Sequence, residues 1–72
     1  MATTLTARYA TEAAARNAHD DLIASGYPRE RVFRPKNLPE VKVMSPRDTL
    51  REAREILGRH GPSKVIERET RD

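Results

Sequence analysis

The sequence predicts a small α+β domain of the ferredoxin-like kind, a two-layer βαββαβ sandwich with two helices on one face of an antiparallel sheet. Two observations predict it. Two amphipathic helical patterns alternate with four short extended patterns, and the second half of the chain repeats the first at an offset of 35 residues. Crossovers between parallel strands are almost always right-handed, so two such halves pack best with their strands interleaved in the order 4-1-3-2.

The internal repeat aligns the positions that specify structure. In both halves an apolar helical stripe is followed by a glycine and then by an apolar pair. The matching positions are Ala15 with Leu50, Ala18 with Ala53, Leu22 with Leu57, Gly26 with Gly61 and, after a two-residue difference in loop length, Val32 and Phe33 with Val65 and Ile66. Each half is therefore expected to run strand, helix, strand.

The first strand and helix are marked by a change of period. Leu5, Ala7 and Tyr9 alternate with polar residues, which is typical of a strand buried on one face. Residues 12–25 then show helical spacing. Thr11 is expected to cap this helix at its start, and Gly26 to end it in the left-handed conformation.

The two middle strands are predicted to form a hairpin. Val32 and Phe33 are an apolar pair followed closely by a proline, which cannot donate a ladder hydrogen bond, so this segment is expected to be a short edge strand. Residues 41–44 alternate again, with two valines on one face and Lys42 and Met44 on the other.

The second helix has strong start and stop signals. Ser45 is expected to be its N-cap, with Pro46 in the first position and Asp48 in the third. Gly61 and the proline after it are expected to end it. Residues 63–69 hold the last strand, and residues 70–72 are expected to fray.

Length and composition limit the class of protein. We expect a single domain over residues 1–72, with an ordered core of about residues 4–69. The chain has no Cys and two His, so neither a disulfide framework nor a structural zinc site is expected, and we expect no cofactor or metal.

The charged residues predict a surface of mixed sign, since fourteen basic and eleven acidic residues leave a net charge of +3. No apolar run could span a membrane and no signal-peptide pattern opens the chain, which predicts a cytoplasmic protein.

Residues 7–33, "ARYATEAAARNAHDDLIASGYPRERVF", resemble the start of small bacterial general-stress (heat-induced stress) protein domains. Those domains begin with a strand, a helix containing Ala and Glu, a Gly, an aromatic residue and a second strand. The matching positions are Tyr9, Glu12, Ala13, Ala14, Leu22, Gly26, Tyr27 and Val32. The resemblance implies the same fold class and supplies no catalytic residue.

Residues suited to acid–base chemistry are few. Asp20 and Asp21 are adjacent on the first helix, so their side chains diverge by about 100°, and His19 faces a third direction. His60 falls in the last turn of the second helix, where a positively charged imidazolium would interact favourably with the negative end of the helix dipole. We therefore expect no enzyme.

The uncovered face of the predicted sheet is the leading candidate for function. Its apolar and cationic side chains suggest a homodimer or a protein partner, bound through this face or through an edge strand. A one-residue change of register would reverse the short edge strand, so the sequence leaves open which of its two apolar residues faces outward. The candidate residues are Arg8, Val32, Phe33, Lys42, Met44 and Ile66.

Weak nucleic-acid or anion binding is the alternative. Arg29, Arg31, Arg34 and Lys36 would supply the phosphate contacts. In an extended strand, Arg29 and Arg31 would share one face with Phe33, and the other two cations would share the opposite face. An RNA-recognition sheet stacks bases on aromatic residues of its central strands, which this sequence lacks on the uncovered face, so nucleic acid ranks second.

Overall fold

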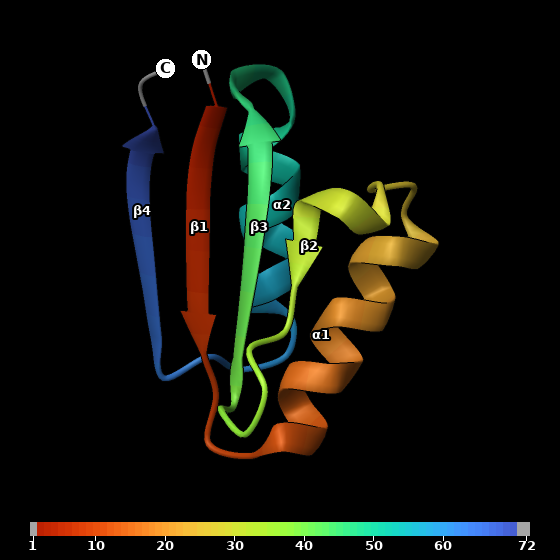
Figure 1. The fold of residues 1–72 in the computed structure, drawn as a ribbon, viewed down its shortest axis with the longest axis vertical. Helices are drawn as coiled ribbons and strands as arrows, with labels where there is room; N and C mark the ends of the chain where they lie inside the picture. The colour runs from red at the N-terminus through yellow and green to blue at the C-terminus, as the bar shows by residue number, and fades with distance from the viewer. Residues whose placement is uncertain (1, 71–72) are drawn as a thin grey trace.

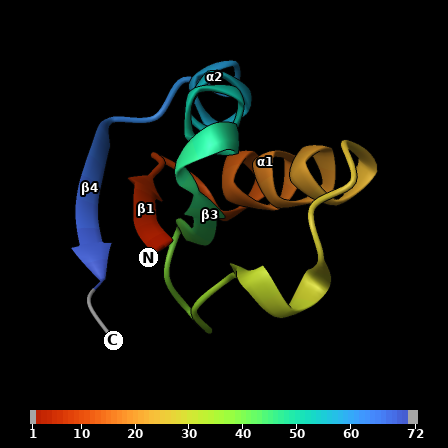
Figure 2. The same ribbon diagram turned by 90° about the horizontal axis from the view of Figure 1, so that it is seen from above.

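The computed structural model describes residues 2–70, and its elements confirm the predicted βαββαβ order. Figure 1 shows α2 behind the sheet and α1 beside it, and Figure 2 shows both helices on one side of the strands. The elements are β1 (Ala2–Arg8), α1 (Glu12–Ala24), the 3-10 helix η1 (Arg29–Arg31), β2 (Val32–Phe33), β3 (Glu40–Pro46), the 3-10 helix η2 (Arg47–Thr49), α2 (Leu50–Gly58) and β4 (Lys64–Thr70).

The sheet has the order β2-β3-β1-β4 with antiparallel neighbours, as the interleaved repeat predicts. β1 is central, and its Leu5 lies opposite Val43 of β3 on one side and Glu67 of β4 on the other. Backbone hydrogen bonds also fix the end of β1. The Tyr9 N–H donates to the Pro39 carbonyl at 2.7 Å, and the Ser63 N–H donates to the Arg8 carbonyl at 2.7 Å.

The core lies between the sheet and the two helices. Alternate residues of β1 and β3 point into it, and small side chains on α1 allow that helix to approach the strands closely. Burial of this apolar surface is the main stabilising term for so short a chain. The buried apolar residues are Leu5, Ala7, Tyr9, Ala15, Ala18, Leu22, Val32, Val41, Val43, Ala53, Ile56 and Leu57.

Helix α1 forms as its end signals predict. The Thr11 hydroxyl accepts a hydrogen bond from the Ala14 N–H at 3.1 Å, which satisfies one of the free donors of the first turn. Gly26 follows the helix with φ +102°, a conformation that residues with a Cβ rarely adopt. The predicted boundary is one residue longer than the observed one.

The predicted start of the second helix is wrong. β3 continues through Pro46, η2 follows, and α2 begins only at Leu50. Ser45 is fully buried within β3 opposite Thr3 of β1, and its hydroxyl lies 2.6 Å from the Thr49 hydroxyl. Ser45 continues the inward alternation of the β3 valines, so pairing with β1 competes successfully with the local capping signal.

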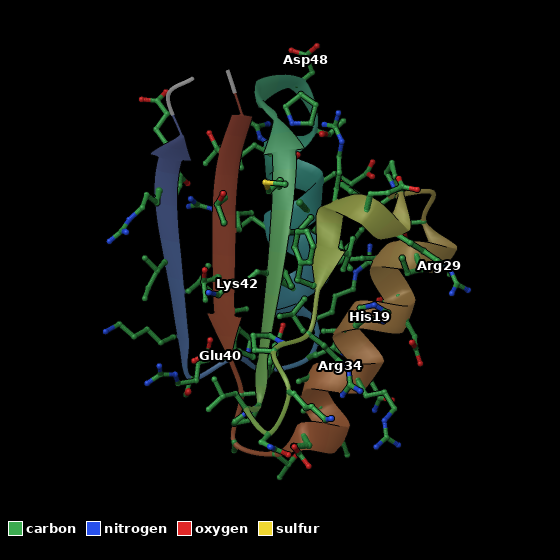
Figure 3. The ribbon with its side chains drawn as sticks, viewed as in Figure 1. His19, Arg29, Arg34, Glu40, Lys42 and Asp48 are labelled. Carbon is green, nitrogen blue, oxygen red and sulfur yellow. The ribbon has the colours of Figure 1, made fainter. Side chains whose placement is uncertain are left out.

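Two further features of α2 differ from the prediction. Asp48 lies in η2 instead of the first turn of α2, and Figure 3 shows it at the end of the molecule beyond β3. α2 ends at Gly58, and Gly61, with φ +66°, belongs to the turn that leads to β4. The fraying expected at the C-terminus falls partly on residues 71 and 72, which lie outside the described residues, while β4 includes Thr70.

The two edge strands are unlike. β2 has two residues and confirms the predicted short edge strand. β4 has seven residues, and its described side chains are exposed on both faces because both helices lie nearer β3 (Figures 1 and 2). Glu67 on the helix side of β4 forms an ion pair with Arg54 of α2.

Candidate interaction surface on the open sheet face

The side of the sheet turned away from the helices is uncovered, and we call it the open face (Figure 2). Side chains alternate along each strand, so every second residue contributes to it. Residues of β1, β3 and β4 form a shallow hollow of about 320 Å³ in this face. The open face consists of Thr4, Thr6 and Arg8 of β1, Phe33 of β2, Glu40, Lys42 and Met44 of β3, and Lys64, Ile66 and Arg68 of β4.

Five of the six predicted surface residues lie on the open face, and Val32 does not. Val32 is 4% exposed, because it lies opposite Val43, whose side chain points into the core. Phe33 is 45% exposed and faces outward. The inclusion of Val32 is therefore corrected, and the structure shows that Phe33 is the outward member of the pair.

Arg8 and Glu40 form an ion pair between neighbouring strands. The Arg8 Nε and Nη2 donate to the same Glu40 oxygen, Oε2, at 3.0 and 2.8 Å. The two residues lie opposite each other in the β1–β3 register. The Glu40 side chain is only 8% exposed, so its carboxylate depends on this charged partner in place of water. The positive charge of Arg8 is correspondingly neutralised.

The other cations of the open face are not neutralised in this way. Lys42, Lys64 and Arg68 are exposed, and within the described part of the chain none of them forms an ion pair. Glu40 is the only carboxylate among the open-face residues, so this face carries a net positive charge. The predicted surface lacks Lys64 and Arg68, because the prediction of the last strand rests on its apolar pair. The period-two spacing of Lys64, Ile66 and Arg68 could have revealed them.

One row of side chains crosses all four strands of the sheet. Ile66 lies opposite Thr6, Thr6 opposite Lys42, and Lys42 opposite Phe33. Ile66 and Phe33 are 41% and 45% exposed. The row therefore has apolar residues at its two ends and a hydroxyl and a cation in its middle.

The basic segment from Arg29 to Lys36 is arranged differently from the prediction. Arg29 and Arg31 lie in a 3-10 helix and not in a strand, so they do not alternate with Phe33. All four cations, Arg34 included, are exposed. Figure 3 shows Arg29 and Arg34 to the side of the part of the sheet marked by Glu40 and Lys42, so these two arginines lie apart from that part of the open face.

A second hollow, also about 320 Å³, lies beside the open face. Arg31 and Met44 both line it, together with Tyr27 and Glu52. The Tyr27 hydroxyl donates to the Thr49 carbonyl at 3.0 Å. Burial, and then the Glu52 charge, raise the pKa of Tyr27. Charges of both signs line this hollow, so it lacks the positive bias of the open face.

The histidines contact acidic residues of α1. His60 lies two residues after α2, and its Nε2 is 3.0 Å from the Asp21 carboxylate, so the pair connects α1 with the turn that follows α2. His19 lies on α1, where Figure 3 labels it, with Nδ1 3.2 Å from the carboxylate of Asp20 beside it. Within residues 2–70 no group of three or more His, Cys, Asp or Glu residues is placed to hold a metal ion.

Comparisons with known proteins identify no relative. No protein-family model, curated protein or solved structure matches this chain. Across the residues that the structure describes, no helix has both the length and the apolar character needed to cross a membrane.

Proposed function

We propose that this chain is a non-catalytic binding module that docks a negatively charged partner on the open face. The observation that supports the proposal is the positive charge on this face: among the described residues, Lys42, Lys64 and Arg68 form no ion pair, and the charge of Arg8 is neutralised by Glu40. A surface of one sign attracts partners of the opposite sign and increases the rate at which they associate. The resemblance to general-stress domains suggests a cellular setting but supplies no binding residue.

Self-association through the open face is less favourable than binding an anionic partner. In a face-to-face dimer, the free cations of one copy would approach those of the other. Juxtaposed like charges in an interface cost free energy unless counterions separate them. The homodimer expected from the sequence is therefore not our choice for this surface.

Self-association through the edge strands also meets an obstacle. If two β4 strands paired antiparallel about a two-fold axis at Ile66, Lys64 of each copy would lie opposite Arg68 of the other. β2, at the other edge, has only two residues to offer. Charged residues on an edge strand are a common means of preventing such pairing.

Fluorescence anisotropy with two labelled polyanions, oligothymidylate and polyglutamate, tests the proposal. The wild-type protein should bind at least one of them at low salt, and added salt should weaken the complex. The double variant Lys42→Glu, Lys64→Glu should lose this binding. The variant Arg16→Glu, Arg51→Glu makes the same change of net charge on exposed positions of α1 and α2 and should retain it.

Two results would contradict the proposal. One is a wild-type protein that binds neither polyanion at low salt. The other is an equal loss of binding in the two double variants, because binding would then depend on net charge and not on the open face. Circular dichroism of each variant checks that it remains folded.

A further inference from the structure

The distribution of apolar and charged side chains on the open face is the reverse of that in a protein interface. Protein interfaces place apolar residues at the centre, where most of the binding energy is concentrated, and charged residues at the rim. Here Thr6 and Lys42 are central, and Ile66 and Phe33 lie at the two ends of the row. A protein partner would have to bury Lys42 at the centre of the contact.

A single-stranded nucleic acid suits this arrangement. Proteins that bind single strands combine cations that follow the phosphates with aromatic side chains on which bases stack. Phe33 faces outward and lies opposite Lys42, so the ring and the cation come from positions about 5 Å apart on neighbouring strands. We propose, on the basis of the proposed function, that the anionic partner is a single-stranded nucleic acid and that one of its bases stacks on Phe33.

The remaining cations extend the phosphate contacts away from Phe33. Lys64 and Arg68 are four residues apart on β4, about 13 Å along the strand. β4 is two strands away from β3, about 10 Å across the sheet. The hydroxyl of Thr6, between Lys42 and Ile66, is a further donor of the kind that binds phosphate oxygens. A single-stranded nucleic acid that crosses the open face from β4 to β2 would therefore contact the cations of β4 first and the ring of Phe33 last.

The orientation of Phe33 changes what the sequence implied about nucleic acid. The central strands indeed carry no aromatic residue on the open face. The stacking group is at the edge of the sheet, on β2, where the sequence could not decide between Phe33 and Val32. With one ring available, we expect stacking of one base and little sequence preference, because every base has a π face.

Anisotropy measurements with one further ligand, an abasic oligodeoxynucleotide, test the inference. An abasic oligodeoxynucleotide has the phosphates of oligothymidylate but no bases, and polyglutamate has neither. The wild-type protein should bind oligothymidylate more tightly than the abasic strand of equal length, by about fivefold or more. Phe33→Leu should abolish this difference without changing the affinity for the abasic strand, whereas Phe33→Tyr should preserve it. Leu38→Ala, at a similarly exposed position in the loop before β3, is the control.

The dependence of affinity on salt tests the phosphate contacts separately. The slope of log affinity against log salt concentration is about −0.7 per phosphate neutralised on a single strand. Three free cations therefore predict a slope of about −2 for oligothymidylate. Lys42→Gln should reduce its magnitude by about 0.7, and Arg51→Gln, on α2, should leave it unchanged.

Different results would contradict this inference and the proposed function. Equal binding of oligothymidylate and the abasic strand, or tighter binding of polyglutamate, would overturn nucleic-acid recognition and leave an anion-binding module. Absence of binding to all three ligands would overturn both. The comparison between oligothymidylate and the abasic strand uses the wild-type protein, so it decides the question even if a Phe33 variant is unstable.

Discussion

The hydroxyl of Tyr9 joins the end of β1 to the end of α2. It donates to the Leu57 carbonyl at 2.8 Å from a side chain that is almost fully buried. Burial raises the pKa of Tyr9 to about 12, because a phenolate in this position would lose its contact with water. The folded protein therefore holds this proton more tightly than the unfolded chain, in which the pKa of tyrosine is about 10.

The stability of the fold should depend on this proton above pH 10. Below that pH both the folded and the unfolded chain keep it, and the contribution of Tyr9 is fully present. Between about pH 10 and 12 the unfolded chain releases it first, so the free energy of unfolding should fall by at most about 1.4 kcal/mol per pH unit. Tyr9→Phe should cost about 1 kcal/mol at neutral pH through the lost hydrogen bond.

Urea unfolding of the wild type and of Tyr9→Phe across this pH range measures the effect. The difference between the two proteins should shrink above pH 10, reach zero at about pH 11 and reverse by about pH 12, since the variant has no proton to lose at this position. Effects of pH on the rest of the chain are common to both proteins and cancel in the difference. A difference that stays constant with pH would show that Tyr9 does not titrate as described.

Residue-level prediction from the sequence is limited where two neighbours have the same chemistry. Val32 and Phe33 are both apolar, and a two-residue strand has too little alternation to fix which one faces the core. The residue that lies opposite Val43 points into the core, and the pairing of the whole hairpin determines that this residue is Val32. In contrast, Arg8, Lys42 and Met44 belong to longer alternating strands, and their outward orientation could be predicted.

At the scale of elements, α1 was predictable and the start of α2 was not. The signals of α1 are local: the Thr11 side chain reaches the Ala14 N–H, and the left-handed Gly26 ends the helix. Ser45 also has the chemistry of a cap, but its opposite residue, Thr3, lies in the first strand of the chain. A capping hydrogen bond is worth about 1 kcal/mol, too little to compensate for removing a buried residue from a central pair of strands.

The two glycines at helix ends should respond oppositely to substitution. Gly26→Ala should destabilise the protein by about 1 kcal/mol or more, since a φ of +102° strains any residue with a Cβ. Gly58→Ala should stabilise it by about 0.5 to 1 kcal/mol, because Gly58 is helical and an added Cβ would meet no atom within 4 Å. Chemical denaturation of both variants measures the two values. Shifts of the same sign would contradict the conformational explanation.

At the scale of the whole molecule, charge on β4 should limit assembly. Antiparallel pairing of two β4 strands about Ile66 would create two contacts between Lys64 and Arg68. Arg68→Glu would convert both contacts to opposite-charge pairs. Cross-strand pairs contribute about 0.2 to 1 kcal/mol each, so the dimer association constant should rise by about two- to thirtyfold.

Sedimentation equilibrium over a range of protein concentrations measures this change. Arg51→Glu makes the same change of net charge at an exposed position on α2. Its dimer association constant should rise only as far as the lower net charge of the whole protein reduces repulsion between copies. If the two variants associate equally, the charges on β4 are not what opposes pairing.

The sequence predicted the topology that makes β4 an edge strand. It could not predict that the helix side of β4 is uncovered, because this depends on how the two helices are positioned across the sheet.

The central position of β1 also affects how the chain can fold. Leu5 lies opposite Val43 and Glu67, both more than half of the 72-residue chain away. During synthesis, β1 emerges before both of its neighbours, β3 and β4, so it cannot pair within this sheet until they have followed. Closing such long loops has an entropic cost that must be met before the sheet gains its contacts. Until then, the backbone N–H and C=O groups of β1 lack their partners in the sheet and can form hydrogen bonds with other extended segments or other chains.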